Sequence, residues 1–180
     1  MRRVLTVILL AAAVGCASSG APNRTPEVHS SSGHGYALLY EMLGQERQVA
    51  QLLLIKVERD SLETVIRAIA ETCDEAYERL ASLAKADPGL DLVATGLPIE
   101  EVRTRQAIAA TRRDQLLAAS GRELELQLLL TQNEALTYMA HLADTLSRSE
   151  SDPTRLAFVR ELWKDLTRLQ ENVLARLRRP

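Results

Sequence analysis

The sequence predicts an all-α protein, an antiparallel four-helix bundle with one extra crossing helix. About three residues in ten are Leu or Ala, a composition typical of helical proteins. Between residues 36 and 86 there is no proline and only one glycine, Gly44. In the second half of that span the apolar residues repeat at alternating spacings of four and three, which favours a helix with one buried face. They are Leu62, Ile66, Ile69, Cys73, Ala76, Leu80 and Leu83.

The chain begins with features of an exported protein. Arg2 and Arg3 precede an uncharged, mostly apolar run over residues 4–14, which fits the core of a signal peptide and is too short to span a bilayer. The sequence Ala13-Val14-Gly15-Cys16 resembles the lipobox of bacterial lipoproteins, although that motif most often carries Leu where Ala13 stands. The resemblance implies cleavage before Cys16 and acylation of its thiol. A plain secretory signal with a free cysteine is the alternative.

Two acyl chains on Cys16 would give stable membrane anchoring, whereas one chain gives only marginal binding. Ala17 follows the cysteine where inner-membrane retention in this family often uses Asp, so the resemblance implies the periplasmic face of the outer membrane. We expect a signal peptide over 1–15, a lipidated cysteine and flexible linker over 16–35, and a helical domain over 36–180. The linker is rich in Ser, Gly and Pro, and His29 and His34 within it are expected to be solvated.

Two helices are expected in the first half of the domain, over 36–58 and 61–86. Asp60 and Glu63 have the spacing of a capping box, which places a turn at 59–61. No glycine or proline near 59–61 forces a helix to break there, so one continuous helix over 36–86 is the alternative.

Three further helices are expected, over 99–118, 121–147 and 153–178. Pro98 precedes the first, Ser120 and Glu123 form a capping box for the second, and Asp152-Pro153 opens the third. The first is rich in arginine and is expected to lie outside the bundle. Inward faces of the other two are predicted at Leu124, Leu128, Ala135, Tyr138, Leu142 and Leu146, and at Leu156, Val159, Trp163, Leu166, Gln170, Val173 and Leu177.

This order of elements, two hairpins joined by a long crossover, is the ferritin-like arrangement. The domain resembles small secreted ferritin-like proteins of unknown function, through Leu97-Pro98, Ser120-Gly121, Asn133-Glu134-Ala135-Leu136 and Asp152-Pro153. A long helical hairpin or coiled coil with a third helix is the alternative.

Composition and missing motifs narrow the function. The chain has 22 basic and 24 acidic residues, and removal of Arg2 and Arg3 leaves 20 and 24, a net charge near −4. This balance argues against a nucleic-acid partner. Neither a glycine-rich phosphate loop, a Gly-x-Ser-x-Gly elbow nor a His-Glu-x-x-His motif occurs in the sequence. We therefore expect no enzyme.

Candidate ligands for a carboxylate metal site are present in the sequence. Ferritin-like di-iron centres use Glu-x-x-His motifs, which this sequence lacks. Polar residues nevertheless interrupt the predicted apolar faces, and buried carboxylates must be paired, protonated or bound to a cation. The candidate ligands are Glu46, Asp74 (or Glu71), Glu134, His141 and Glu171, and a polar stripe combines Gln127, Thr131, Glu134, Tyr138 and His141. Solvation, or pairing with arginine, is the alternative for each acid.

With Cys16 lipidated, Cys73 is the single remaining thiol and is expected to be a buried apolar residue. The function expected from the sequence is a membrane-anchored periplasmic lipoprotein whose helical bundle is a non-catalytic binding or scaffold module. Its partners would be the bilayer and another envelope protein. A ferritin-like metal-binding or redox protein, and a self-associating coiled-coil protein, are the alternatives.

Overall fold

The computed structural model describes residues 31–52 and 60–178, and all its regular elements are helices. These are α1 (Ser31–Glu46), the short 3-10 helix η1 (Val49–Leu52), α3 (Asp60–Ala86), α4 (Ile99–Ala118), α5 (Gly121–Ser149) and α6 (Pro153–Leu177). The all-α prediction is therefore confirmed for these residues. The signal peptide, Cys16 and most of the predicted linker lie outside them. Among the helices described, none combines the length and the apolar character that crossing a bilayer requires.

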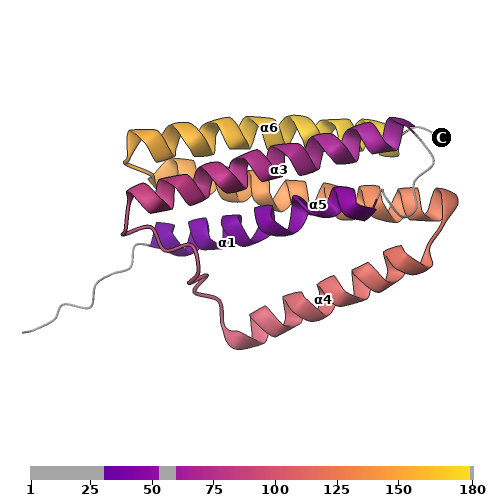
Figure 1. Ribbon diagram of the computed structural model, residues 1–180, viewed down its shortest axis with the longest axis horizontal. Helices are drawn as coiled ribbons and strands as arrows, with labels where there is room; N and C mark the ends of the chain where they lie inside the picture. Colours follow the sequence, from indigo (N-terminus) through magenta and orange to yellow (C-terminus); the bar gives the residue numbers. More distant parts are fainter. Residues whose placement is uncertain (1–30, 53–59, 179–180) are drawn as a thin grey trace, which may run out of the picture.

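Four helices lie side by side and the fifth stands apart from them. In Figure 1, α1, α3, α5 and α6 form one stack, and α4 runs obliquely below it. Within the stack, α1 packs on α3 and α5, and α6 packs on the same two helices. Packed neighbours run in opposite directions along the long axis of the molecule. The core therefore lies along the centre of these four helices.

The predicted buried face of α3 is confirmed. Ile66, Ile69, Cys73 and Leu80 are fully enclosed, because a four–three spacing keeps these side chains on one side of the helix. The predicted faces of α5 and α6 are wrong in part. Tyr138 and Trp163 are each 40% exposed, and the core is filled instead by neighbours one to six positions away on the same helices. These neighbours are Leu136, Met139 and Ala143 on α5, and Phe158, Leu162 and Leu169 on α6.

Helix α1 differs from its predicted range at both ends. It begins at Ser31 rather than 36 and ends at Glu46, so the continuous helix over 36–86 is not formed. Two glycines are tolerated because each allows a close approach. A Cβ atom on Gly35 would lie 2.8 Å from Leu146 Cδ2, and one on Gly44 would lie 3.1 Å from the Tyr77 ring. Glycine thus brings α1 close to α5 and α3.

The predicted break between α4 and α5 is confirmed, but the capping box is not. Helix α4 ends at Ala118 and α5 begins at Gly121, whose φ of 56° suits glycine. The Ser120 side chain makes no capping hydrogen bond, and Glu123 accepts one from Gln127 Nε2 at 3.0 Å instead. At α6 the predicted cap forms, because Asp152 Oδ1 accepts the Arg155 backbone N–H at 2.8 Å.

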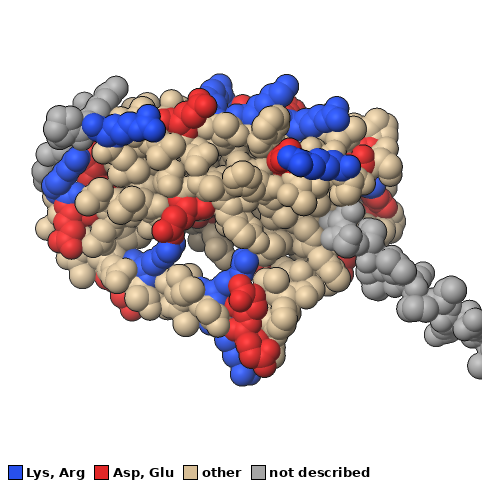
Figure 2. Space-filling model, turned by 180° about the vertical axis from the view of Figure 1, so that it is seen from behind, with Lys and Arg blue, Asp and Glu red and all other residues tan. Residues whose placement is uncertain are grey.

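Helix α4 lies outside the stack, as its arginine content predicts. Leu116 is its only buried residue. Figure 2 shows an opening between α4, at the bottom of the view, and the rest of the molecule. Long arginine side chains connect the two parts, since Arg112 pairs with Glu134 and Arg105 contacts Tyr138 on α5. Polar pairs therefore form part of the contact between α4 and α5, while Leu116 packs in the hydrophobic core.

Candidate functional site

The structure does not bring the five candidate metal ligands together. Asp74 pairs with Arg47 at 3.1 Å, and Glu134 pairs with Arg112, so both acids have cationic neighbours at the surface. His141 and Glu171 are exposed, as is the alternative candidate Glu71. Within residues 31–52 and 60–178, no three His, Cys, Asp or Glu side chains are placed to hold one metal ion.

Glu46 is the candidate that faces the interior. It lies at the last position of α1, and its Oε2 accepts a hydrogen bond of 2.9 Å from Gln132 Nε2 on α5. Gln132 is 2% exposed, and its Oε1 is buried without a hydrogen-bond partner among the described residues. Burial raises the pKa of the Glu46 carboxyl, and the hydrogen bond from Gln132 opposes that rise only in part. The carboxyl therefore takes up a proton more readily than an exposed one.

Cys73 on α3 interacts electrostatically with Glu46. Burial, and secondarily the negative charge of Glu46, raises the pKa of the Cys73 thiol. The thiol is fully enclosed. A reactive cysteine needs a lowered pKa and access to solvent, so Cys73 has the properties of a structural core residue. The prediction of a buried cysteine is confirmed.

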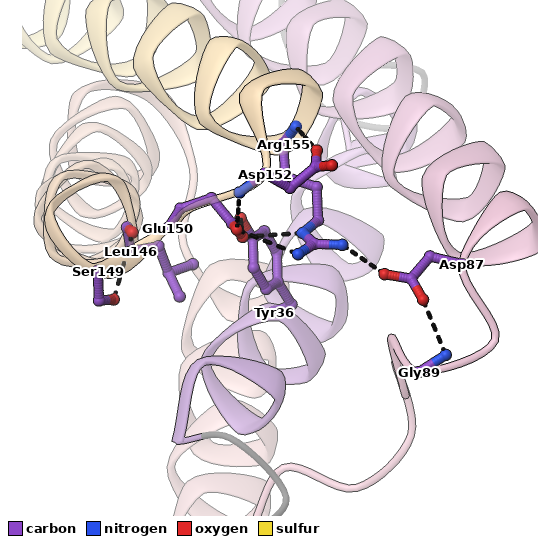
Figure 3. A network of polar contacts seen from close by, with 8 residues as sticks. All are labelled: Tyr36, Asp87, Gly89, Leu146, Ser149, Glu150, Asp152 and Arg155. Atoms are coloured by element: carbon purple, nitrogen blue, oxygen red, sulfur yellow. Dashed lines mark hydrogen bonds and ion pairs between the residues drawn. The ribbon is translucent and has the colours of Figure 1, made fainter.

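A second polar cluster closes the end of the stack at which α1 begins (Figure 3). Glu150, between α5 and α6, has a side chain only 4% exposed. It accepts hydrogen bonds from the Tyr36 hydroxyl at 2.7 Å, from Arg155 Nε at 2.8 Å and from the Asp152 backbone N–H at 2.8 Å. Arg155 also pairs with Asp87 at the end of α3. The cluster thus connects α1, α3 and α6.

The electrostatics of this cluster follow from its geometry. The hydrogen bond from Arg155 outweighs burial and lowers the pKa of Glu150 to about 2. Burial, and then the hydrogen bond to Glu150, raises the pKa of the Tyr36 hydroxyl. Both oxygens of the Glu150 carboxylate accept hydrogen bonds from residues of the protein itself. The cluster is therefore suited to holding helices together.

A third buried acid lies near the other end of α5. The side chain of Glu125 is 4% exposed and contacts Arg122 at 3.1 Å and Arg176 at 3.3 Å. Burial alone would raise the pKa of Glu125, but the hydrogen bonds and charges of the two arginines lower it on balance. Arg176, in the last turn of α6, thus connects α6 to α5.

Two residues of the polar stripe of α5, Glu134 and Tyr138, contact arginines of α4. Arg105 Nη2 donates to the Tyr138 hydroxyl at 3.2 Å, and the Arg105 guanidinium lies 5.3 Å from the centre of the Tyr138 ring. Thr131 donates to the backbone carbonyl of Gln127 within α5. Glu134 and Tyr138 therefore serve the α4–α5 contact, whereas Thr131 bonds within its own helix.

Sequence reasoning missed Gln132, Glu125, Glu150 and Arg155. A signal existed for Glu150 and Arg155, because both flank the capping sequence Asp152-Pro153. No local signal marks Glu125, whose second partner lies 51 residues away. Comparison with models of protein families, with characterised proteins and with solved structures finds no match to this chain.

Proposed function

We propose that this chain is a lipid-anchored protein of the cell envelope, whose helical domain is a non-catalytic binding or scaffold module. The observation that carries the proposal is Ala13-Val14-Gly15-Cys16 at the end of an uncharged, mostly apolar run. Acylation of Cys16 would place the domain at the periplasmic face of a membrane. The residue at position 17, which is not Asp, favours the outer membrane. We further propose that the four stacked helices and the α4 crossover are a ferritin-like arrangement.

The interactions of the buried and paired polar side chains support a structural role for the domain. Glu150, Glu125 and Glu134 each pair with arginine, and Cys73 is an enclosed thiol with a raised pKa. These contacts hold helices to one another and leave the same groups poorly suited to acid–base or nucleophilic chemistry. Of the metal-ligand candidates, Glu46 alone faces the interior.

Fractionation tests the anchor. The full chain, expressed in a bacterium and fed an alkyne fatty acid, should incorporate the label and sediment with membranes. Cys16→Ser should lose both properties while keeping the helical circular-dichroism spectrum of the domain. A membrane-bound, labelled Cys16→Ser variant, or an unlabelled wild-type chain in the soluble fraction, would overturn the proposal. Crosslinking in intact envelopes would then identify what the domain contacts.

A further inference from the structure

We propose that the loop between α3 and α4 docks into the bilayer interface beside the lipid anchor. The docking segment is residues 92–99, Leu-Val-Ala-Thr-Gly-Leu-Pro-Ile, which are the end of the loop and the first residue of α4. None of them carries a charge, although 26% of the chain is charged. Val93 is 88% exposed and Ile99 is 55% exposed, the two highest values among the large apolar residues described. The inference rests on the proposed lipid anchor and adds a second membrane contact to it.

The loop is held in a shape that presents Val93 to solvent. Leu90 is buried in the core and Leu92 packs partly against it, so the start of the loop is fixed to the stack. The Asp91 carboxylate accepts the backbone N–H of Val93 at 2.7 Å and that of Ala94 at 3.3 Å. These contacts form a local turn with the Val93 side chain on its outer side. The exposure of Val93 therefore comes from an organised turn.

The loop lies at the end of the molecule from which the anchor would extend. Figure 1 shows the α3–α4 connection beside the start of α1. Gly96 contacts the first turn of α1 so closely that a Cβ atom there would lie 2.4 Å from His34 Nδ1. Residues 17–30 separate Cys16 from Ser31, and a Ser-, Gly- and Pro-rich segment of that length has an r.m.s. span of about 20 Å. An acylated Cys16 would keep this end of the domain close to the bilayer.

The proposed anchor makes a lipid surface the partner that the loop meets. The lipid anchor would hold the loop at a high effective concentration near the bilayer. Insertion of two exposed apolar side chains could then be favourable, although it would be too weak to bind a protein without the anchor. Acidic residues flank the loop, namely Asp91, Glu100 and Glu101. Anionic lipids should therefore oppose docking, and zwitterionic lipids should permit it.

The test uses the full lipidated chain in phosphatidylcholine vesicles. A nitroxide is attached at Ala94→Cys, beside Val93, with Glu171→Cys on the exposed face of α6 as the matched control. Cys73 is fully buried and Cys16 is acylated, so each introduced cysteine is the accessible thiol. Collisions with oxygen, which concentrates in lipid, are compared with collisions with a water-soluble nickel complex.

We expect the label at position 94 to favour oxygen and the label at 171 to favour the nickel complex. Adding Val93→Ser should lower the docked-to-undocked ratio about tenfold, the effect of losing one buried apolar side chain. Phosphatidylglycerol vesicles should lower it further. A vesicle-bound chain whose label at 94 is as open to the nickel complex as that at 171 would overturn the inference and leave the anchor standing. Spin–spin broadening at 94 between copies would overturn it in favour of self-association, and a wild-type chain that does not bind vesicles would overturn both proposals.

Discussion

Glu46 and Gln132 meet between α1 and α5 with the amide nitrogen 2.9 Å from one carboxylate oxygen, while the amide oxygen has no partner among the described residues. A carboxyl that keeps its proton can donate to an amide oxygen and accept from the amide nitrogen at the same time. Protonation of Glu46 would therefore complete the pair. Burial raises the pKa of Glu46, and this shift also favours the protonated carboxyl.

The first prediction concerns Glu46→Gln. Because the folded pKa of Glu46 lies above its unfolded value, Glu46 makes the protein less stable as pH rises from the unfolded pKa through the folded one. A glutamine removes this dependence. We expect Glu46→Gln to unfold at higher temperature than wild type at pH 8, and the advantage to shrink or vanish at pH 4.

Glu134→Gln is the control, because Glu134 is exposed and paired with Arg112, and its stability should change by no more than about 0.5 kcal/mol at either pH. If Glu46→Gln lowers the melting temperature at pH 8 as much as at pH 4, then Glu46 is not a carboxyl that prefers its proton.

Glu150 should have the opposite pH dependence. Its folded pKa of about 2 lies below the ordinary value of 4.5, so its contribution is present above pH 4.5 and is lost as pH falls toward 2. A shift of this size corresponds to roughly 3 kcal/mol. Glu150→Gln should therefore lower the free energy of unfolding at pH 7 by roughly 3 kcal/mol. Between pH 5 and pH 2.5 the variant should lose less stability than the wild type does.

Urea unfolding at several pH values measures this effect. The control is Glu161→Gln, which removes an exposed pair with Arg79 and should cost at most about 1 kcal/mol. Equal losses for the two variants at pH 7 would show that the enclosed cluster is no stronger than a surface pair.

The strict apolar repeat of α3 made that helix predictable, because a single face carries all its burial. The helices α5 and α6 were predicted less well. Apolar residues on them occupy more than one face, so periodicity alone could not exclude Tyr138 or Trp163 from the core. The start of α1 was missed because Ser31 and the glycines after it have a loop-like composition, and the close approach of Gly35 to Leu146 is a tertiary feature.

The polar contacts were less predictable than the helices. The sequence pointed to Glu46 as an unusual acid within an apolar face, and the structure places it inward. Its partner Gln132 lies 86 residues away, and the Tyr36–Glu150 bond joins residues 114 apart. Pairings over such separations are set by how the helices pack, which no local pattern in a single sequence records.

Two glycines of α1 should respond in opposite ways to the same substitution. Gly35→Ala places a methyl group 2.8 Å from Leu146 Cδ2, in a packed interface, whereas a methyl group on Gly33 meets nothing within 4 Å. Alanine favours a helix over glycine by up to about 1 kcal/mol. We expect Gly33→Ala to be neutral or stabilising, and Gly35→Ala to be less stable than Gly33→Ala by about 1–3 kcal/mol, the usual cost of overpacking.

Thermal unfolding of the two variants provides the comparison. Stabilisation of both by similar amounts would mean that α1 does not lie as close to α5 as the structure places it.

The thiol of Cys73 should react only when the protein unfolds. It is fully enclosed, and burial raises its pKa, so the native protein offers neither access nor thiolate. With Cys16→Ser to remove the other thiol, we expect a thiol reagent at pH 8 to label the native chain far more slowly than the chain in urea. Glu150→Gln should speed native labelling, because a less stable stack opens more often. Ala94→Cys, an exposed thiol in the same protein, should be labelled at once and serves as the positive control. Native labelling of Cys73 at the rate of position 94 would require a path from solvent into the centre of α3.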